Sequence, residues 1–286
     1  MISASIVIHN TPAPQILKAS ECLLSSPRIS HILFIDNSPG DDLRNVVEQT
    51  SDPRVEYLHV DNRGFGAGHN VAIRKIFSQD YPESIPDYHI VMNADVSWSG
   101  DVPARLEDYM DSHPDAGMVM PRVWYPDGDL QYACRRLPTP WDLIAKRFLP
   151  DFLTRRRMRR YLLADASHDV PFSCPYLLGS FLFFRREALL EAEGFDERFF
   201  MYPEDIDITR RIHRHWDTMF WPGVDIIHEH AAASRRSGRM LRIHMENMIR
   251  YFNKWGWLCD RERREFNRRL DRTLTPAASD APKGRG

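Results

Sequence analysis

The sequence contains little cysteine and no long apolar run, and both absences exclude classes of protein. Only four cysteines occur in 286 residues, and no two of them form a CxxC pair. Neither a cysteine-based zinc site nor a redox dithiol is therefore indicated, and a reducing, cytoplasmic setting is expected. No run approaches the roughly 18 apolar residues that cross a bilayer, and the start of the chain lacks the pattern of a signal peptide. The net charge of -2 predicts no general attraction to nucleic acid.

The composition that remains is that of an ordinary globular protein. Apolar residues make up 43% of the chain and charged residues 27%, which is enough to bury a sizeable core. Buried strands are predicted at ASIVIHN, HILFID, VEYLHV and YHIVMNAD, with helical segments after the first and third. This alternation predicts an α/β fold with a Rossmann-like, mostly parallel central sheet flanked by helices. No linker is evident, so residues 1–260 are expected to form one domain, and residues 261–286 a basic helix and a disordered tail.

Polar side chains follow the predicted strands after the first. The residues concerned are Asp36, Asp61, Asn62, Asn93 and Asp95. Aspartate and asparagine are common turn formers, which would explain any one of them. Ligands of parallel sheets bind beyond the carboxyl ends of the strands, and the repetition along the chain favours a cleft lined by these residues.

A glycine-rich stretch, DNRGFGAGHN at residues 61–70, follows the third predicted strand. Glycines such as Gly64 allow the backbone to approach a ligand closely. The amides of Asn62 and Asn70, which flank the glycines, could hydrogen-bond a ribose or a base. The stretch is neither a GxGxxG nor a Walker motif, so a plain loop is the favoured explanation.

Two further patterns have the chemistry of a metal site. In MNADV, Asn93 and Asp95 point to one side of a strand end, which suits a hard divalent cation that holds a diphosphate. A simple turn would give the same spacing. In IIHEHAAAS, His228 and His230 alternate and so point the same way. Neutral imidazole binds metals well, and this pair favours a site.

The stretch FFMYPEDIDITRRIHRH, residues 199–215, joins an aromatic run to an acidic helix start. Acidic residues in a first helical turn are favoured by the helix dipole, so an ordinary helix start is one explanation. The alternative is that Glu204 and Asp205 place a general base at a rigid helix start. Asp207 is interpreted as a hydrogen-bonding support of that helix.

Taken in order, FIDNSPGD, DNRGFGAGHN, MNAD, GFDERFFMYPEDIDITRR and HEHAAAS resemble the inverting family 2 glycosyltransferases of the GT-A fold. The bacterial rhamnosyltransferase-like branch is the most similar in pattern. The resemblance covers residues 1 to about 258. It implies a nucleotide-binding half over residues 1–100, an acceptor and catalytic half over residues 101–260, and a helical tail.

The resemblance also implies roles for individual residues. Asp205 would be the general base with Glu204 beside it, and the aromatic run before them would stack on a pyranose. Asp95 and either His228 or His230 would meet the metal. Asn93 replaces the first acid of the usual DxD motif, a change that is frequent in the rhamnosyltransferase branch. The residues that would line the nucleotide-sugar site are Asp36, Asn62, Gly64, Asn70, Asn93, Asp95, Gly179 and Ser180.

The implied reaction moves a sugar from a nucleotide diphosphate sugar to a saccharide or lipid-linked saccharide, in bacterial surface polysaccharide synthesis. dTDP-rhamnose is the first choice of donor and a UDP-sugar the second, with Mg²⁺ or Mn²⁺ as cofactor. An inactive sugar-nucleotide-binding or scaffold protein is the alternative that Asn93 allows, although the retained acids oppose it. An NAD-dependent oxidoreductase would need GxGxxG after the first strand, where HNTPAP stands.

Two basic segments remain outside this assignment. Residues 141–163 mix large apolar side chains with a dense arginine cluster. Such a segment can lie on an anionic membrane, here the inner face of the plasma membrane. Equally, it can be a solvated face that packs on the core or on a second copy in a homodimer. Residues 261–272 are less apolar, and an exposed helix is expected there.

Overall fold

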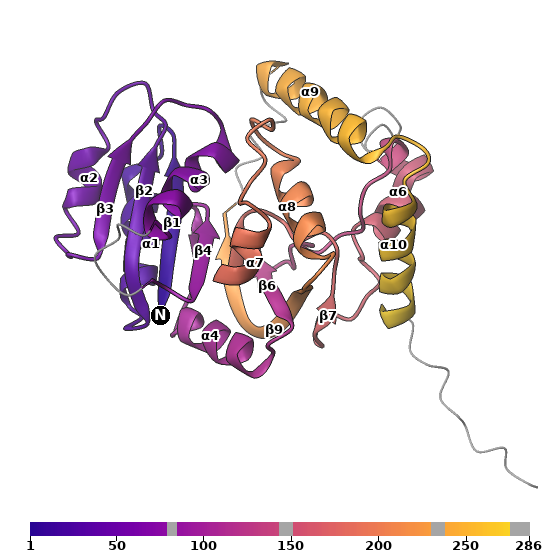
Figure 1. The fold of residues 1–286 in the computed structure, drawn as a ribbon, viewed down its shortest axis with the longest axis horizontal. Helices are drawn as coiled ribbons and strands as arrows, with labels where there is room; N and C mark the ends of the chain where they lie inside the picture. The colour runs from indigo at the N-terminus through magenta and orange to yellow at the C-terminus, as the bar shows by residue number, and fades with distance from the viewer. Residues whose placement is uncertain (79–84, 143–150, 230–237, 275–286) are drawn as a thin grey trace, which may run out of the picture.

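The computed structural model describes residues 1–78, 85–142, 151–229 and 238–274. These residues form a nine-stranded sheet in the order β3-β2-β1-β4-β8-β6-β9-β5, with β7 paired to β9 (Figure 1). The strands are β1 Ile2–Ile8, β2 Ile29–Asp36, β3 Val55–His59, β4 Tyr88–Met92, β5 Val96–Ser97, β6 Ala116–Trp124, β7 Phe172–Ser173, β8 Phe181–Arg185 and β9 Asp217–His228.

The N-terminal half has the parallel arrangement that its strand–helix alternation predicts. Strands β1 to β4 pair in parallel, so that Ile8 lies opposite Asp36 and Asp36 opposite His59. The helices are α1 Ala13–Leu24, α2 Arg44–Glu48 and α3 Phe65–Ile76. Successive residues of β2 point to opposite faces: Leu33 and Ile35 cluster with α3, whereas Ile32 and Phe34 cluster with α1. The predicted α/β sheet with helices on both faces is therefore confirmed.

The C-terminal half continues the same sheet with a change of direction. Strand β8 lies antiparallel between β4 and β6, and β6 then pairs in parallel with β9. The sequence predicts two short strands, TMFW and VDIIHEH, where the structure has the single strand β9. Its register with β6 shifts beyond Trp221, where Pro222 and Gly223 interrupt the apolar pattern that signals a strand.

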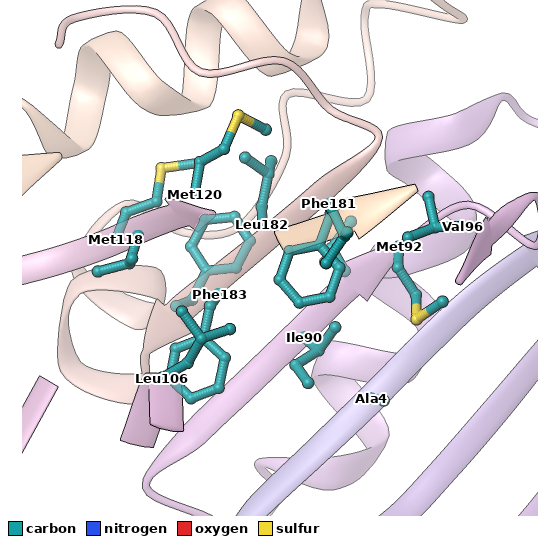
Figure 2. Close-up of a cluster of buried hydrophobic side chains, with 14 of the residues drawn as sticks. Ala4, Ile90, Met92, Val96, Leu106, Met118, Met120, Phe181, Leu182 and Phe183 are labelled. Carbon is teal, nitrogen blue, oxygen red and sulfur yellow. The ribbon is translucent and has the colours of Figure 1, made fainter. Parts of the chain in front are cut away.

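One apolar core joins the two halves. Figure 2 shows Ile90 and Met92 of β4 beside Phe181 and Phe183 of β8, with Met118 of β6 farther along. These five side chains are fully buried. At roughly 2 kcal/mol for each large apolar side chain, this shared cluster holds the halves firmly together.

The remaining helices are α4 Val102–Ser112, α6 Asp151–Tyr161, α7 Arg186–Glu191, α8 Glu204–Ile212, α9 Gly238–Trp255 and α10 Arg261–Leu274. An exposed helix is predicted for α10, but the helix is only partly exposed. Phe266 and Leu270 are buried on one of its faces. The predicted disordered tail, residues 275–286, lies outside the described residues. Within the described part of the chain, no helix has both the length and the apolarity to cross a bilayer.

Candidate active site

The first turn of α8 holds the carboxylate of Asp205 in a fixed orientation. Its Oδ2 accepts hydrogen bonds from the Gly179 amide at 3.0 Å and from the Tyr176 hydroxyl at 3.4 Å. Its Oδ1 accepts one from the Ile206 amide at 2.8 Å. Only 5% of Asp205 is exposed. A side chain constrained in this way can present its carboxylate in one direction with little loss of entropy on binding.

The segment that carries Gly179 connects Asp205 to the end of β4. A Cβ at Gly179 would stand 3.0 Å from the Cβ of Asp205, so glycine allows this close approach. The next residue, Ser180, accepts a hydrogen bond through its carbonyl oxygen from the Asn93 amide at 2.9 Å. Residues from three distant parts of the sequence are thereby brought together at one edge of the sheet.

Asn93, Asp95 and His228 lie close together at that same edge. Strand β5 pairs antiparallel with β9, and Val96 lies opposite His228. His228 Nε2 lies 3.3 Å from Asp95 Oδ1 and 3.5 Å from Asn93 Nδ2. His230 lies outside the described residues.

A residue that the sequence analysis missed, Gln131, orients His228. Its side-chain oxygen lies 2.7 Å from His228 Nδ1, and both side chains are buried. An amide oxygen facing Nδ1 can accept a hydrogen bond from that nitrogen, which fixes the orientation of the ring with Nε2 beside Asp95. A lone glutamine in a turn forms no pattern, so no sequence signal could have identified it.

At the carboxyl end of β2, Asp36 is fully buried. Its Oδ1 accepts a hydrogen bond from the Ser38 amide at 2.8 Å, and its Oδ2 accepts one from the Tyr57 hydroxyl at 2.6 Å. Burial, reinforced by the Asp36 charge, raises the pKa of Tyr57 well above its usual range. These bonds shape the loop after β2, and contact of Asp36 with a base or ribose stays a prediction.

The glycine-rich stretch enters α3 through tight packing against the chain itself. Gly64 has a φ of 106°, and a Cβ there would meet the Phe200 oxygen at 2.2 Å. A Cβ on Gly66 would stand 2.8 Å from Phe195, and one on Gly68 would stand 2.7 Å from Val7. Close packing therefore accounts for all three glycines without a ligand.

The two flanking asparagines differ in exposure. Asn62 is exposed, and its Oδ1 accepts a hydrogen bond from the Gly64 amide at 3.2 Å. Asn70 is buried and bonds both ways to Phe195, donating to its carbonyl at 2.8 Å and accepting from its amide at 2.9 Å. Asn70 thus links α3 to the segment that leads into α8. Nucleotide contact stays a prediction for both residues.

Two side chains of the aromatic–acidic stretch serve the fold. Phe199 is 1% exposed within an apolar cluster, so it offers no surface for stacking on a sugar. Asp207 is fully buried, and its Oδ1 lies 2.6 Å from Lys254 Nζ and accepts a hydrogen bond from Trp255 Nε1 at 2.8 Å. Asp207 anchors α8 to α9 and thereby fixes the turn that carries Asp205.

Comparison with known protein families assigns the chain. Residues 3–191 match the family model described as Glycosyl transferase family 2. The chain belongs to glycosyl transferase family 2. The match ends before α8, so Glu204, Asp205 and His228 of this glycosyltransferase lie beyond the matched segment.

Two curated relatives extend over most of this glycosyltransferase. The N-acetylglucosaminyl-diphospho-decaprenol L-rhamnosyltransferase of Mycobacterium tuberculosis is 28% identical over 242 residues, covering 81% of this chain and 77% of the relative. Rhamnosyltransferase WbbL of Escherichia coli is 24% identical over 260 residues, covering 90% and 94%. The resemblance to rhamnosyltransferase-like members of family 2 is confirmed.

Solved structures share the fold. GalNAc-T7 with UDP, GalNAc and Mn²⁺ is similar with a TM-score of 0.57 at 14% identity, over 80% of this chain but only 43% of the GalNAc-T7 chain. Mannosyltransferase PcManGT from Pyrobaculum calidifontis, in complex with GDP-Man and Mn²⁺, is similar with a TM-score of 0.51 at 15% identity, over 97% of this chain and 76% of the other. The predicted GT-A fold is thereby confirmed.

The two neighbouring carboxyl groups of α8 have different proton affinities. Burial raises the pKa of Glu204 well above its usual range, and the charge of Asp205 adds to the increase. Burial also raises the pKa of Asp205, but the Gly179 and Ile206 amides and the charge of Arg135 limit it to about 6. Glu204 therefore holds its proton more tightly than Asp205, whose pKa of about 6 leaves it ionised at neutral pH. Of the two, Asp205 is the one able to accept a proton.

The donor set beside β5 suits a divalent cation that phosphates help to hold. Asp95 offers a carboxylate and His228 an oriented imidazole nitrogen, and both are common ligands of Mn²⁺. Gln131 supplies the hydrogen bond that orients a ligating histidine in many metal sites. Within the described ranges, no group of three or more histidine, cysteine or acidic side chains could hold a metal ion. A bound diphosphate would supply further ligands.

Proposed function

We propose that this family 2 glycosyltransferase moves a sugar, with inversion, from a nucleotide diphosphate sugar to a lipid-linked saccharide. dTDP-rhamnose is the first choice of donor and a UDP-sugar the second. The donor and acceptor follow from the relatives, of which one is named for transferring L-rhamnose to N-acetylglucosaminyl-diphospho-decaprenol. The proposed setting is the synthesis of a bacterial surface polysaccharide.

One observation carries the catalytic part of the proposal. The ionisable carboxylate of Asp205 is tied through Gly179 and Ser180 to Asn93, at the edge where Asp95 and His228 meet. A base and a diphosphate-binding group on one edge are what a direct displacement requires. The higher proton affinity of the neighbouring Glu204 supports the assignment of the base to Asp205.

The chemical step is a single displacement. Asp205 accepts the proton of the acceptor hydroxyl while that oxygen forms a bond to the anomeric carbon. The bond from the anomeric carbon to the phosphate oxygen breaks on the opposite face, and the nucleoside diphosphate leaves with the electron pair. Attack opposite the leaving group inverts the configuration at the anomeric carbon. Ser180 and Gly179 border the proposed sugar position.

Asp95 and His228 would hold Mg²⁺ or Mn²⁺, with Asn93 beside them as a neutral donor. When bound, the cation supplies neutralisation of the charge that develops on the leaving diphosphate. The rest of the site is built by the chain itself. Gln131 fixes the orientation of the His228 ring through Nδ1, and the Ser180 carbonyl fixes the backbone of Asn93.

The proposal is tested with a donor panel. The purified chain is incubated with a lipid-linked N-acetylglucosamine acceptor and with dTDP-rhamnose, UDP-sugars or GDP-mannose, with Mn²⁺ or with EDTA. Metal-dependent transfer from dTDP-rhamnose is expected, and NMR of the product should show the inverted anomer. Binding of sugar nucleotides without transfer from any donor would contradict the proposal and favour an inactive binding protein. Full activity in EDTA would show that the transfer needs no divalent cation, and that part of the proposal would be wrong.

A further inference from the structure

Helix α6 exposes apolar and basic side chains on the same outward face. Phe152 is 79% exposed and Leu153 is 64% exposed. Arg155, Arg156 and Arg159 are exposed beside them. These five residues are called the arginine face below. An exposed phenylalanine and leucine forgo the favourable free energy of burying apolar surface. Their exposure on one helix face therefore indicates a binding role.

The positive charge of the arginine face is only partly neutralised by the protein. Arg159 forms an ion pair with Asp165. Across the described ranges, Arg155 and Arg156 have no ion pair with an acidic side chain. On the opposite side of the helix, Thr154 and Tyr161 are buried. Helix α6 is therefore fixed to the molecule by its inner face, and it presents a basic surface with two apolar side chains.

The neighbouring elements continue this surface. Leu258 is 71% exposed in the turn between α9 and α10, and the preceding Trp257 is also exposed. Arg160 of α6 pairs with Asp271 of α10 at 3.0 Å, which joins the two helices. Figure 1 shows α6 and α10 next to each other at the end of the molecule far from β3. The exposed apolar side chains of α6 and of the turn before α10 therefore belong to elements at one end of the protein.

We propose that the arginine face docks on the surface of an anionic lipid bilayer. Arginine side chains pair with lipid phosphates, while exposed phenylalanine and leucine side chains enter the boundary between headgroups and acyl chains. A second copy of the chain is disfavoured, because a twofold contact would bring the two sets of arginines together. A nucleic acid duplex would bind through the positive charge and would leave the side chains of Phe152 and Leu153 unused.

The inner face of α6 connects the docking surface to the candidate base. Tyr161, on that face, hydrogen-bonds Arg135, and the charge of Arg135 lowers the pKa of Asp205. An acceptor anchored in the bilayer would thus reach the protein on the side from which α6 leads to Asp205. This consequence rests on the proposed function, whereas the docking itself does not.

Vesicle flotation of the full chain tests the docking without any sugar donor. Vesicles of phosphatidylcholine mixed with phosphatidylglycerol are compared with vesicles of phosphatidylcholine alone. The chain should float with the anionic vesicles only, and less at high salt. The double variant Arg155→Ala/Arg156→Ala should bind at least about tenfold more weakly, and Phe152→Ser/Leu153→Ser should also weaken binding.

A matched control removes the same charge elsewhere. The variant Lys18→Ala/Arg28→Ala loses two exposed cations of the N-terminal half and should float like the wild type. Equal loss of binding in both double variants would overturn the proposal, because net charge rather than the arginine face would then explain it. Binding of an oligonucleotide that is lost only in the α6 variant would overturn it in favour of nucleic acid. A dimer that dissociates only in that variant would favour a second copy.

Failure of the docking and failure of the proposed function give different results. If the arginine-face variant floats like the wild type while sugar transfer is intact, the docking proposal alone is wrong. If the wild type floats as expected but transfers no sugar, the proposed function alone is wrong. Transfer to a water-soluble acceptor by the arginine-face variant should equal that of the wild type.

Discussion

Both halves of the molecule bury ionisable side chains whose charged form is disfavoured, but the two halves bury opposite kinds. In the N-terminal half, burial lowers the pKa of His89 to about 3 and lowers that of His69 well below its usual range. In the C-terminal half, burial raises the pKa of Glu204 well above its usual range and that of Asp205 to about 6. Removal from water disfavours the cation in one case and the anion in the other.

The partners of these groups differ as well. Ser3 Oγ lies 2.8 Å from His89 Nδ1, and Ser5 Oγ lies 2.9 Å from His89 Nε2 and 2.7 Å from His69 Nδ1. This chain of neutral hydrogen bonds is enclosed in the sheet. Asp205 is held by backbone amides at the sheet edge, and its pKa is close to neutral. Enclosed groups with neutral partners support a fold, whereas a group near its titration point can exchange a proton with a substrate.

The largest expected effect separates the two acids of α8. Asp205→Asn should lower kcat by about 10²- to 10⁴-fold, the usual contribution of a general base. Nucleotide binding, measured by calorimetric titration, should be unchanged because the side chain keeps its shape. Loss of donor binding in this variant would exclude the base role.

The matched control is Glu204→Gln. Burial raises the pKa of Glu204 and so favours its protonated form, which a glutamine imitates, and most of the activity should remain. If this variant were inactive and Asp205→Asn active, the two acids would have exchanged roles.

A second prediction concerns His228, which is oriented by a hydrogen bond and not only by burial. Gln131→Leu should weaken Mn²⁺ binding in the presence of nucleotide by about 10- to 100-fold, as the loss of an orienting partner typically does. Calorimetry measures the affinity directly, without turnover. Gln131→Glu should recover most of it, because a carboxylate oxygen also accepts from Nδ1. Equal affinity in all three proteins would show that Gln131 has no part in orienting His228.

The pH dependence of the reaction should report Asp205. Only the ionised carboxylate accepts a proton, so kcat/KM should fall about tenfold for each pH unit below the pKa. With the pKa of Asp205 at about 6, the decline should begin near that pH as the solution is acidified. Circular dichroism at each pH verifies that the chain is folded. A profile that stays level well below pH 6 would contradict the raised pKa.

The sequence predicts the N-terminal half well, because each of its strands is one apolar run followed by turn residues. The place of β8 was not predictable, since its pairing of Tyr88 with Arg185 joins segments far apart in the chain. Strand β9 was divided in two, because Pro222 and Gly223 resemble a turn when the partner strand is unknown.

Candidate site residues could be proposed where a local pattern marks them. Asn93 and Asp95 share a strand end, and acidic residues open α8. Gln131 and Tyr57 have no such pattern, because only tertiary contacts bring them to His228 and Asp36. The glycine-rich stretch shows the opposite case. Its pattern is compatible with a ligand, but packing against Phe200, Phe195 and Val7 accounts for its glycines.

The smallest expected effect concerns the buried histidines of the N-terminal half. A histidine with a folded-state pKa of about 3 and an ordinary value of 6.5 binds its proton only after unfolding. Above pH 6.5 it has no effect on stability, and below it the free energy of unfolding should fall by up to about 1.4 kcal/mol per pH unit. Asp205 has the opposite sign, because its raised pKa makes the fold less stable as the pH rises toward 6.

Urea unfolding of His89→Gln between neutral pH and pH 5 isolates this term, since glutamine bonds to both serines but takes up no proton. The slope of stability against pH should become shallower by about 1.4 kcal/mol per pH unit. The exposed His215→Gln should leave the slope unchanged. If His89→Gln also leaves it unchanged, His89 titrates within the folded protein. The enclosed histidines would then exchange protons as readily as Asp205, and the distinction between a structural and a catalytic half would lose its basis.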